Sequence, residues 1–386
     1  MRIITRTVLI LSLVSLLADV ASEMLYPVIP VYLKEIGFTV FWIGLLEGLA
    51  SFTAGFSKGY FGKLSDQKGI RLPLVRIGYF LSAVSKPMMV FFVYPVWVFF
   101  SRTLDRLGKG IRTAPRDALL SSEATRETKG RIFGFHRGMD TLGATIGPAL
   151  TLMFLYFYPQ HYKTVFYFAF IPGIISVAFL FFLKEKKNPT TQRGGNFFSF
   201  FRYWNMATPE YKKLVTGLLL FALINSSDIF LLLKTKEVTG NDNITIAAYI
   251  FYNLIFAIAS YPLGALADKL SFKKVLLSGF LLFAVVYGCF AFQPSVAEIF
   301  ILFFIYGFYA AATDGVSKAW LTNIAHNNNT STAIGFYTSC ESVCTFLSSI
   351  IAGAIWTGLG SFYTFSISAL VSILVVIYFL FVIKPA

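Results

Sequence analysis

Five basic side chains recur within an otherwise apolar part of the chain, in the stretch SRTLDRLGKGIRTAPRDALL at residues 101–120. An α-helix turns by about 100° per residue, which brings Arg102, Arg106, Lys109, Arg112 and Arg116 into an arc of about 120° on one face. Because a charge that faces lipid costs at least about 2.5 kcal/mol, this face must contact water or acidic side chains within the protein. A row of cations in that setting is suited to binding an anion or to holding carboxylates.

Acidic residues in the apolar runs are candidates for proton binding. They are Asp19, Glu23, Glu47, Asp140, Asp228, Asp314 and Glu341. Burial favours the neutral acid and a neighbouring cation favours the carboxylate, so a small movement can change the proton occupancy. We predict that Asp19 and Glu23, which share one helical face, couple proton movement, with Arg106 as the modulating cation and Glu341 as a second candidate. A static ion pair that fixes helix packing is the alternative for each.

A third set of residues has the chemistry to contact a substrate. The residues assigned to this role are Arg102, Arg106, Lys109, Tyr26, Asp228, Asp314 and Tyr337. Packing or lipid contact is the alternative for the aromatic members. Asp314 and Lys318 match Arg112 and Arg116 under an offset of 202 residues, so the two halves of the chain place opposite charges at the first of these positions.

The composition indicates a membrane protein. The chain has 386 residues, of which 56% are hydrophobic and 13% are charged, whereas about 25% of the residues in soluble domains are charged. Three cysteines without CxxC spacing and three scattered histidines predict neither a disulfide framework nor a metal site. The first apolar run continues through Asp19 and Glu23 into YPVIPVYL, so we expect a retained first span rather than a cleaved signal peptide.

Twelve apolar runs are long enough to cross a bilayer, which takes about 20 residues per helix. They cover residues 7–34, 40–62, 73–93, 95–118, 131–157, 163–183, 213–235, 244–267, 273–292, 296–322, 331–357 and 360–383. Lys and Arg gather in the loops on one side, which predicts cytoplasmic N- and C-termini in a bacterial inner membrane and places Arg116 and Asp117 at the cytoplasmic edge. The net charge of +14 then reflects topology and contact with anionic membrane lipids, and we expect no nucleic-acid partner.

The chain divides into two similar halves. GYFGKLSDQKGIR at 59–71 follows the second run, and YPLGALADKLSFKK at 261–274 follows the eighth. We predict an N-terminal six-helix bundle at 1–184, a cytoplasmic linker at 185–211 and a C-terminal six-helix bundle at 212–386. The linker segment FFSFFRYW is expected to lie on the membrane surface. An internal repeat of this size is typical of transporters with a central site between two pseudo-symmetric halves.

These repeated stretches resemble the cytoplasmic loop motif of the major facilitator superfamily. The first copy reads GKLSDQKGIR at 62–71, and a weaker second copy lies at 264–274. RLGKG at 106–110 resembles the fourth-helix Arg-x-x-Gln-Gly motif, with Lys109 where Gln is usual. GATIGP at 143–148 resembles the fifth-helix motif associated with antiporters, although the usual trailing glycine pair is missing.

The resemblance implies an all-α membrane protein with twelve transmembrane helices in two pseudo-symmetric six-helix bundles around a central cavity. It also implies gating roles within the motifs. The residues assigned to gating are Gly62, Asp66, Arg71, Arg116, Gly143, Gly147, Pro148 and Asp268. Small residues with this spacing let helix backbones approach closely, Pro148 bends its helix, and Asp66 is placed to accept from Arg and Lys of neighbouring loops as a latch.

Two transport functions fit these features. The first is a proton-coupled exporter of a small organic solute by alternating access, supported by the antiporter-like motif and the buried carboxylates. The second is a proton-driven importer or exchanger of an organic anion, such as a siderophore-like or phosphorylated compound, supported by the dense positive charge. A membrane sensor with a transporter fold is a third reading without specific support.

No nucleophile–base motif, phosphate-binding loop or ATPase element appears in the sequence. We therefore expect no enzyme activity and no cofactor, with a monomeric protein that binds protons, membrane lipids and a small-molecule substrate. An ion gradient would supply the energy, and facilitated diffusion stays open. The sequence does not name the substrate or the direction of transport.

Overall fold

The computed structural model describes residues 3–26, 28–38, 40–185, 197–325 and 329–383. Within these residues the chain is helical and contains no strand. The helices run in the order α1(Arg6–Glu23), α2(Val28–Glu35), α3(Val40–Lys68), α4(Leu72–Phe91), α5(Pro95–Ser122), α6(Lys129–Phe157), α7(Tyr162–Phe179), η1(Leu180–Phe182), η2(Phe197–Arg202), α8(Tyr203–Met206), α9(Pro209–Ala222), α10(Ile229–Thr239), α11(Asp242–Lys269), α12(Phe272–Phe290), α13(Val296–Ile324), α14(Thr330–Leu359) and α15(Ser361–Val382). The predicted all-α membrane fold class is confirmed.

Each predicted span coincides with a helix, but two spans are broken. The first becomes α1 and α2, and the seventh becomes α9 and α10. The helices that resume after the two breaks begin at Val28 and Ile229, which are 201 residues apart and so occupy corresponding places in the repeat. Hydropathy averages across a short break, so it does not reveal either one.

Within the described residues, seven helices are long and apolar enough to cross a membrane. α1 and α5 are not among them, although they occupy predicted spans. α1 includes Arg6, Asp19 and Glu23, and α5 includes the basic row. The charges that make these two helices interesting for function also lower their apolar character.

The chain separates into two compact units. The first comprises residues 1–123, 139–206 and 326–339, and the second comprises residues 124–138, 207–325 and 340–386. α6 and α14 therefore contribute their beginnings and their remainders to different units. The bundle boundaries expected from the sequence stay a prediction. They follow the linker at 185–211, whereas the two compact units follow contacts in space.

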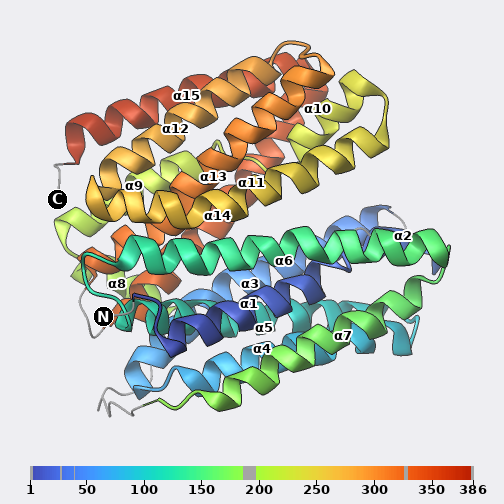
Figure 1. Ribbon diagram of the computed structural model, residues 1–386, viewed down its shortest axis with the longest axis horizontal. Helices are drawn as coiled ribbons and strands as arrows, with labels where there is room; N and C mark the ends of the chain where they lie inside the picture. Colours follow the sequence, from blue (N-terminus) through green and yellow to red (C-terminus); the bar gives the residue numbers. More distant parts are fainter. Residues whose placement is uncertain (1–2, 27, 39, 186–196, 326–328, 384–386) are drawn as a thin grey trace. The chain divides into compact units, whose positions relative to one another are not determined.

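The first unit is built on helices that pack along one another, as Figure 1 shows for α1, α4, α5 and α7. Close contact between α4 and α5 depends on two glycines. A Cβ at Gly78 would lie 2.6 Å from the carbonyl oxygen of Gly108, and a Cβ at Gly108 would lie equally close to that of Gly78. α1, α2 and α7 enclose an apolar core that includes Leu25, Tyr32 and Phe166.

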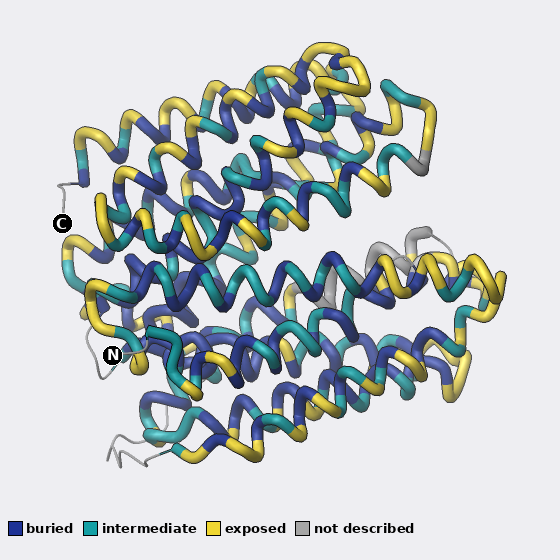
Figure 2. Tube along the Cα trace, viewed as in Figure 1, coloured by how far each residue is buried: buried dark blue, intermediate teal, exposed yellow. Residues whose placement is uncertain are grey.

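The second unit has an aromatic core and an apolar outer surface. α9 and α12 bring together Phe221, Phe280 and Phe283, and the rings of Phe221 and Phe280 stack with centroids 4.1 Å apart. Figure 2 shows buried and exposed residues alternating along α15, where Leu374 and Phe381 are among the exposed side chains. Exposed apolar side chains along a helix of this length suit contact with lipid.

Local sequence explains several helix boundaries. Thr5 and Thr208 cap α1 and α9 by accepting a hydrogen bond from the backbone three residues later. Ser295 forms a capping box with Glu298 at the start of α13. α10 ends at Gly240, whose φ of 62° is a left-handed conformation that glycine adopts without a steric penalty.

Candidate functional site

The deep end of the basic row on α5 forms a buried ion-pair network with α4. Asp105 Oδ1 lies 3.3 Å from the Nζ of Lys86, and its Oδ2 lies 3.4 Å from Arg102 Nη1. The hydroxyl of Ser82 donates to Oδ1 at 2.5 Å. Removing such charges from water is costly unless they pair, which explains why the four side chains gather.

This network bears on Arg102, which we assigned to a substrate site. Its side chain is buried and engaged with Asp105. Lys109, by contrast, is exposed although it lies in the middle of α5. Arg106 is half-buried between them. Arg102 is therefore paired inside the first unit, whereas Lys109 is accessible.

Arg112 has an aromatic partner rather than an acidic one. Its guanidinium carbon lies 4.2 Å from the ring centroid of Tyr79, in a cation–π contact. The side chain is 3% exposed, and its Nη1 has no hydrogen-bond partner among the described residues. The position is thus fixed by packing against α4.

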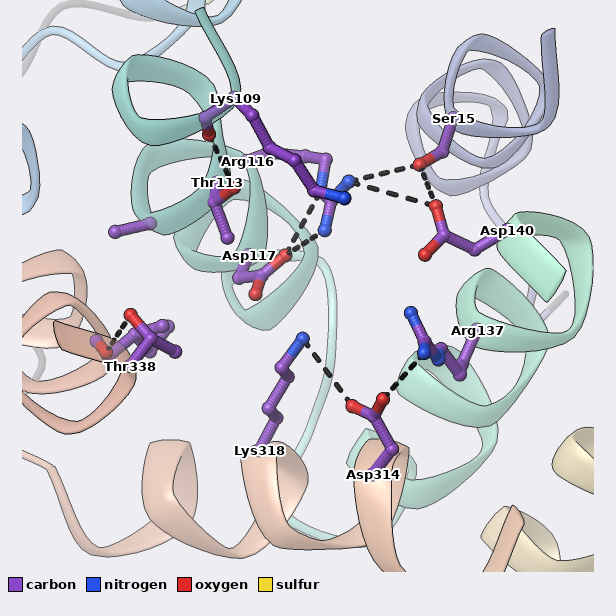
Figure 3. Close-up of polar contacts among 12 residues, drawn as sticks. Ser15, Lys109, Thr113, Arg116, Asp117, Arg137, Asp140, Asp314, Lys318 and Thr338 are labelled. Atoms are coloured by element: carbon purple, nitrogen blue, oxygen red, sulfur yellow. Dashed lines mark hydrogen bonds and ion pairs between the residues drawn. The ribbon is translucent and has the colours of Figure 1, made fainter. Parts of the chain in front are cut away.

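A second polar cluster joins α5 to α1 and α6 in the first unit (Figure 3). Arg116 donates to Ser15 Oγ at 2.9 Å and pairs with Asp117 Oδ1 at 2.9 Å, and its Nη1 lies 4.0 Å from Asp140 Oδ1. The hydroxyl of Ser15 also donates to Asp140. Tyr79 accepts from Arg116 at 3.4 Å.

Arg116 and Asp117, which we expected at the cytoplasmic edge, are both buried in the protein, Asp117 completely. α5 continues beyond the predicted span to Ser122. Arg116 therefore sits inside the helical packing, more than a turn before the helix ends.

Asp19 lies beside this cluster. The charges that act most strongly on its carboxyl group are those of Asp140, Lys109 and Glu23. Asp19 and Glu23 are both half-buried. The charges that act most strongly on Glu23 are those of Lys109 and Arg106. The structure therefore brings the acids of α1 to the cations of α5.

Two glycines of the GATIGP stretch bring α6 against α1. A Cβ at Gly143 would lie 2.5 Å from the Leu16 carbonyl oxygen and 3.0 Å from the Cβ of Asp19. A Cβ at Gly147 would lie 2.8 Å from the Val20 carbonyl oxygen. Pro148 follows within α6 and is buried. Backbone contact at both glycines leaves no room for side chains there.

A partly buried set of charges lies in the second unit. Arg137 Nη2 is 2.8 Å from Asp314 Oδ2, and Lys318 Nζ is 3.6 Å from Asp314 Oδ1 (Figure 3). The guanidinium of Arg137 also lies 5.1 Å from the ring centroid of Phe256. Asp314 is partly accessible, since 31% of its side chain is exposed.

Asp228 lies in the break between α9 and α10. Its carboxylate accepts from the hydroxyls of Tyr306 at 2.6 Å and Tyr252 at 3.3 Å. The tyrosine rings contact each other with centroids 5.0 Å apart. Irregular backbone within a membrane-spanning element is tolerated where it is buried in protein or lines a polar site.

Asp66 and Asp268 each bind the beginning of a helix. Asp66 accepts from the backbone N–H of Thr332 at 2.6 Å and of Ser331 at 3.3 Å, at the start of α14. Asp268 accepts from Gly130 at 2.7 Å and Arg131 at 2.9 Å, at the start of α6. The first N–H groups of a helix lack intrahelical partners and carry partial positive charge.

These two contacts differ from the latch that we expected. Asp66 was to accept from cations of neighbouring loops, and one such contact exists, with Arg71 Nη2 at 3.6 Å. Its shorter bonds come from the backbone N–H groups of Ser331 and Thr332 and from the Thr332 hydroxyl. Gly62 contributes by close approach, because a Cβ there would lie 2.4 Å from the Ser331 carbonyl oxygen. The gating assignment itself stays a prediction.

The aromatic linker segment packs on α3 and α14. Phe200 is completely buried, and a Cβ at Gly59 would lie 2.5 Å from its ring. Trp204 stacks on Phe336 with centroids 5.6 Å apart. Phe198 is 60% exposed. One side of the segment is thus anchored in the first unit, while the expected membrane contact of the other side stays a prediction.

Two groups near the predicted cytoplasmic ends have shifted pKa values. Burial, assisted by the charge of Arg126, lowers the pKa of Lys129 to about 8. The Nζ of Lys129 donates to the Thr322 carbonyl at 2.6 Å. Burial, followed by the nearby Asp66 carboxylate, raises the pKa of Tyr203 to about 12.

Three further candidates lie after α1 or in α14. Tyr26 is exposed after the end of α1, Tyr337 is buried in α14, and Glu341 is half-buried one turn later. The side chain of Glu47 lies outside the described residues. Among the described residues, no group of three or more His, Cys, Asp or Glu side chains could hold a metal ion.

Sequence reasoning missed several partners that complete these clusters. Lys86 and Ser15 lie within helices that look apolar, and nothing in their spacing connects them to Asp105 or Asp140. One signal was available. Lys86 is a charge inside a predicted span, and such charges in membrane segments generally have an acidic partner.

Comparison with known proteins gives a consistent result. The sequence model of the Major Facilitator Superfamily matches residues 11–252 and 241–386. An uncharacterized MFS-type transporter of Methanocaldococcus jannaschii is 31% identical over 362 residues, which cover 92% of this chain and 89% of the relative. The multidrug resistance protein MdtG of Klebsiella pneumoniae is 25% identical over 337 residues, covering 83% and 78% of the two chains.

Solved structures share the fold. The human organic anion transporter MFSD10 (TETRAN) superposes with a TM-score of 0.80 at 14% identity, covering 97% of this chain and 99% of its own. The Escherichia coli fucose:proton symporter FucP gives a TM-score of 0.77 at 13% identity, covering 97% and 98%. At these identities the likeness concerns the fold alone.

Proposed function

The chain belongs to the Major Facilitator Superfamily, and on that premise we propose that it is a proton-coupled exporter of a small organic solute. It would act by alternating access in a bacterial inner membrane with both termini in the cytoplasm. The similarity to a multidrug resistance protein over most of the chain supports efflux.

One observation carries the proposal. Asp19 and Glu23 are half-buried on α1, and both interact with the Lys109 charge on α5. Lys109 is itself exposed. A carboxylate beside an accessible cation stays ionised while the cation is close, and it takes up a proton when that interaction is lost. Proton binding and solute binding therefore compete at such a site.

The alternating step has a candidate device in the two acidic caps. Asp66 holds the start of α14 and Asp268 holds the start of α6. Each helix must lose its cap if its beginning moves away from the carboxylate. We propose that Asp66, Asp268, Arg71 and Gly62 stabilise one state of the transport cycle in this way.

The alternative is a proton-driven importer or exchanger of an organic anion. The exposed Lys109 favours it, as do the partly exposed Arg137 and Lys318. The burial of Arg102 against Asp105 counts against it, because that cation already has its carboxylate. We therefore rank efflux first.

Proteoliposomes with an acidic interior separate the two functions. Ethidium serves as the cationic probe and fluorescein as the anionic one. Export coupled to protons predicts ethidium accumulation that nigericin abolishes and that Glu23→Gln reduces at least tenfold. Glu237→Gln is the matched control, since Glu237 pairs with Lys234 at the exposed end of α10.

Two results would count against export. Efflux of preloaded fluorescein accompanied by protons, with no movement of ethidium, would favour the anion importer. Equal ethidium flux with and without the gradient, in both the parent protein and Glu23→Gln, would refute proton coupling.

A further inference from the structure

Asp314 on α13 lies between two cations of the second unit (Figure 3). Its Oδ2 is 2.8 Å from Arg137 Nη2, and its Oδ1 is 3.6 Å from Lys318 Nζ. Each oxygen of the carboxylate therefore faces a different positive charge. An organic carboxylate or phosphate bound in the same place would make the same two contacts, because guanidinium and ammonium groups are the usual protein partners of these anions.

The three charges are within reach of a dissolved ion. The exposed fraction of the side chain is 31% for Arg137 and Asp314 and 17% for Lys318. By contrast, Asp105 and its cationic partners in the first unit are no more than 9% exposed. An ion can therefore approach the group around Asp314, whereas the network around Asp105 is closed to it.

Contacts that do not involve Asp314 hold Arg137 in position. Its guanidinium carbon lies 5.1 Å from the ring centroid of Phe256 on α11, in a cation–π contact. The backbone of α6 also approaches α11 closely at the next residue, where a Cβ at Gly138 would lie 2.8 Å from the Ala257 carbonyl oxygen. Loss of the Asp314 carboxylate would therefore leave this guanidinium in place.

We infer that Arg137 and Lys318 form an anion-binding site, and that Asp314 occupies it as an internal ligand that keeps organic carboxylates and phosphates out. The statement about binding depends on the contacts within the second unit alone. Its consequence for transport, a preference for cationic over anionic solutes, rests on the proposed export function.

The internal carboxylate has an advantage over an anion in solution. Asp314 and Lys318 are one turn apart on the same helix, so the carboxylate is always beside the ammonium group. A partner tethered in this way acts at an effective concentration of about millimolar or more. An organic anion at a lower concentration displaces it only by making much stronger contacts of its own. Asp314 therefore sets which charge of solute the second unit accepts.

Fluorescence anisotropy of fluorescein tests the site without any gradient, on the purified full chain in phosphatidylcholine nanodiscs. We expect Asp314→Asn to bind fluorescein at least about tenfold more tightly than the parent protein, because the internal competitor is gone. Asp314→Glu keeps a carboxylate and should bind like the parent. Adding Arg137→Gln or Lys318→Gln to Asp314→Asn should return the affinity to the parent value, because the site then has one cation.

Glu237→Gln is the matched control, because it removes one negative charge from the same unit. Glu237 Oε1 pairs with Lys234 Nζ at 3.0 Å, and the Lys234 side chain is only 3% exposed. This substitution therefore makes no accessible cation available, and the affinity for fluorescein should equal that of the parent. Asp314→Ser is a second uncharged variant, which gives the same test if Asp314→Asn folds poorly.

Three results would overturn the inference. The first is an unchanged affinity for fluorescein in the folded Asp314→Asn or Asp314→Ser protein. The second is an equal gain in Glu237→Gln, since fluorescein would then respond to the overall charge. The third is an equal gain in Asp314→Glu, since altered packing rather than the lost charge would then open the site.

The proteoliposome assay separates this site from the proposed function. If Asp314→Asn gains fluorescein binding but no gradient drives ethidium or fluorescein through the parent protein, the proposed function fails and the anion site stands. If the parent exports ethidium and Asp314→Asn gains no fluorescein binding, export stands and the anion site fails.

Discussion

Replacing Asp66 by Asn should release the beginning of α14 and leave the beginning of α6 in place. The Asp66 carboxylate accepts from Thr332 N at 2.6 Å, Thr332 Oγ1 at 2.8 Å and Ser331 N at 3.3 Å. Asparagine has one acceptor oxygen, and its amide nitrogen would face an N–H donor on the other side. The variant therefore loses the charge on every bond and at least one bond outright.

The expected magnitude follows from these contacts. A hydrogen bond to a charged group contributes about 1.5–3 kcal/mol. Losing one and weakening the others should cost about 2–3 kcal/mol, which is about a 30- to 150-fold rise in the population with the helix start released. Because the first N–H groups of a helix have no intrahelical acceptor, the protection of Ser331 and Thr332 amides depends on Asp66.

Hydrogen–deuterium exchange read by mass spectrometry measures this directly. Exchange in residues 329–336 should accelerate in Asp66→Asn, with residues 129–136 unchanged. Asp268→Asn is the matched control and should give the reverse pattern, since Asp268 accepts from Gly130 and Arg131. Unchanged exchange at 329–336, or equal acceleration of both segments in both variants, would refute the assignment of one carboxylate to one helix.

Gly264→Ala should reduce the free energy of unfolding by about 1–3 kcal/mol or more and so lower the midpoint of thermal unfolding, because a Cβ there would lie 2.1 Å from the Gly130 carbonyl oxygen. Gly358→Ala is the control: a Cβ at that position has nothing within 4 Å, so the substitution should be neutral or stabilising. Burial lowers the pKa of Lys129 to about 8 from the ordinary 10.5, so between these values the unfolded chain binds more protons and stability rises with pH. The rise in unfolding temperature from pH 8 to pH 10 should therefore be smaller in Lys129→Gln, and an identical rise would contradict the shift. Phe200→Ala removes a completely buried ring and should reduce the free energy of unfolding by about 3–5 kcal/mol. Phe198→Ala, at a side chain that is 60% exposed, should change thermal stability little. Equal effects of the two substitutions would argue against anchoring of the linker through Phe200.

The fold could be predicted from the sequence to a large extent. Apolar runs of membrane-spanning length coincide with helices because the bilayer fixes both the length and the composition of such elements. The repeat around Asp66 and Asp268 also placed these two residues at equivalent positions. Hydropathy did not locate the breaks after Glu23 and Ala222, because it reports burial and not backbone continuity.

The candidate site was only partly accessible from the sequence. Helical periodicity put Asp19 and Glu23 on one face and grouped the cations of α5, which depends on local geometry alone. Which acid meets which base depends on contacts between residues far apart in the chain. Ser15 and Asp140 are separated by 125 residues, and no local spacing indicates that they meet.

Asp268 and Asp66 accept hydrogen bonds from backbone N–H groups at the starts of α6 and α14, and every amino acid except proline has such a group. The Ser331 side chain can therefore change during evolution without loss of its bond to Asp66, whereas Gly130 is fixed by space, because a Cβ there would lie 2.2 Å from the Gly264 carbonyl oxygen, and Arg131 adds a side-chain contact to Asp268 at 3.7 Å. Alignments of relatives would show a constant acid at position 66 and, opposite it, a variable residue at position 331. Covariation between paired positions, the usual trace of such a contact, would be weak here.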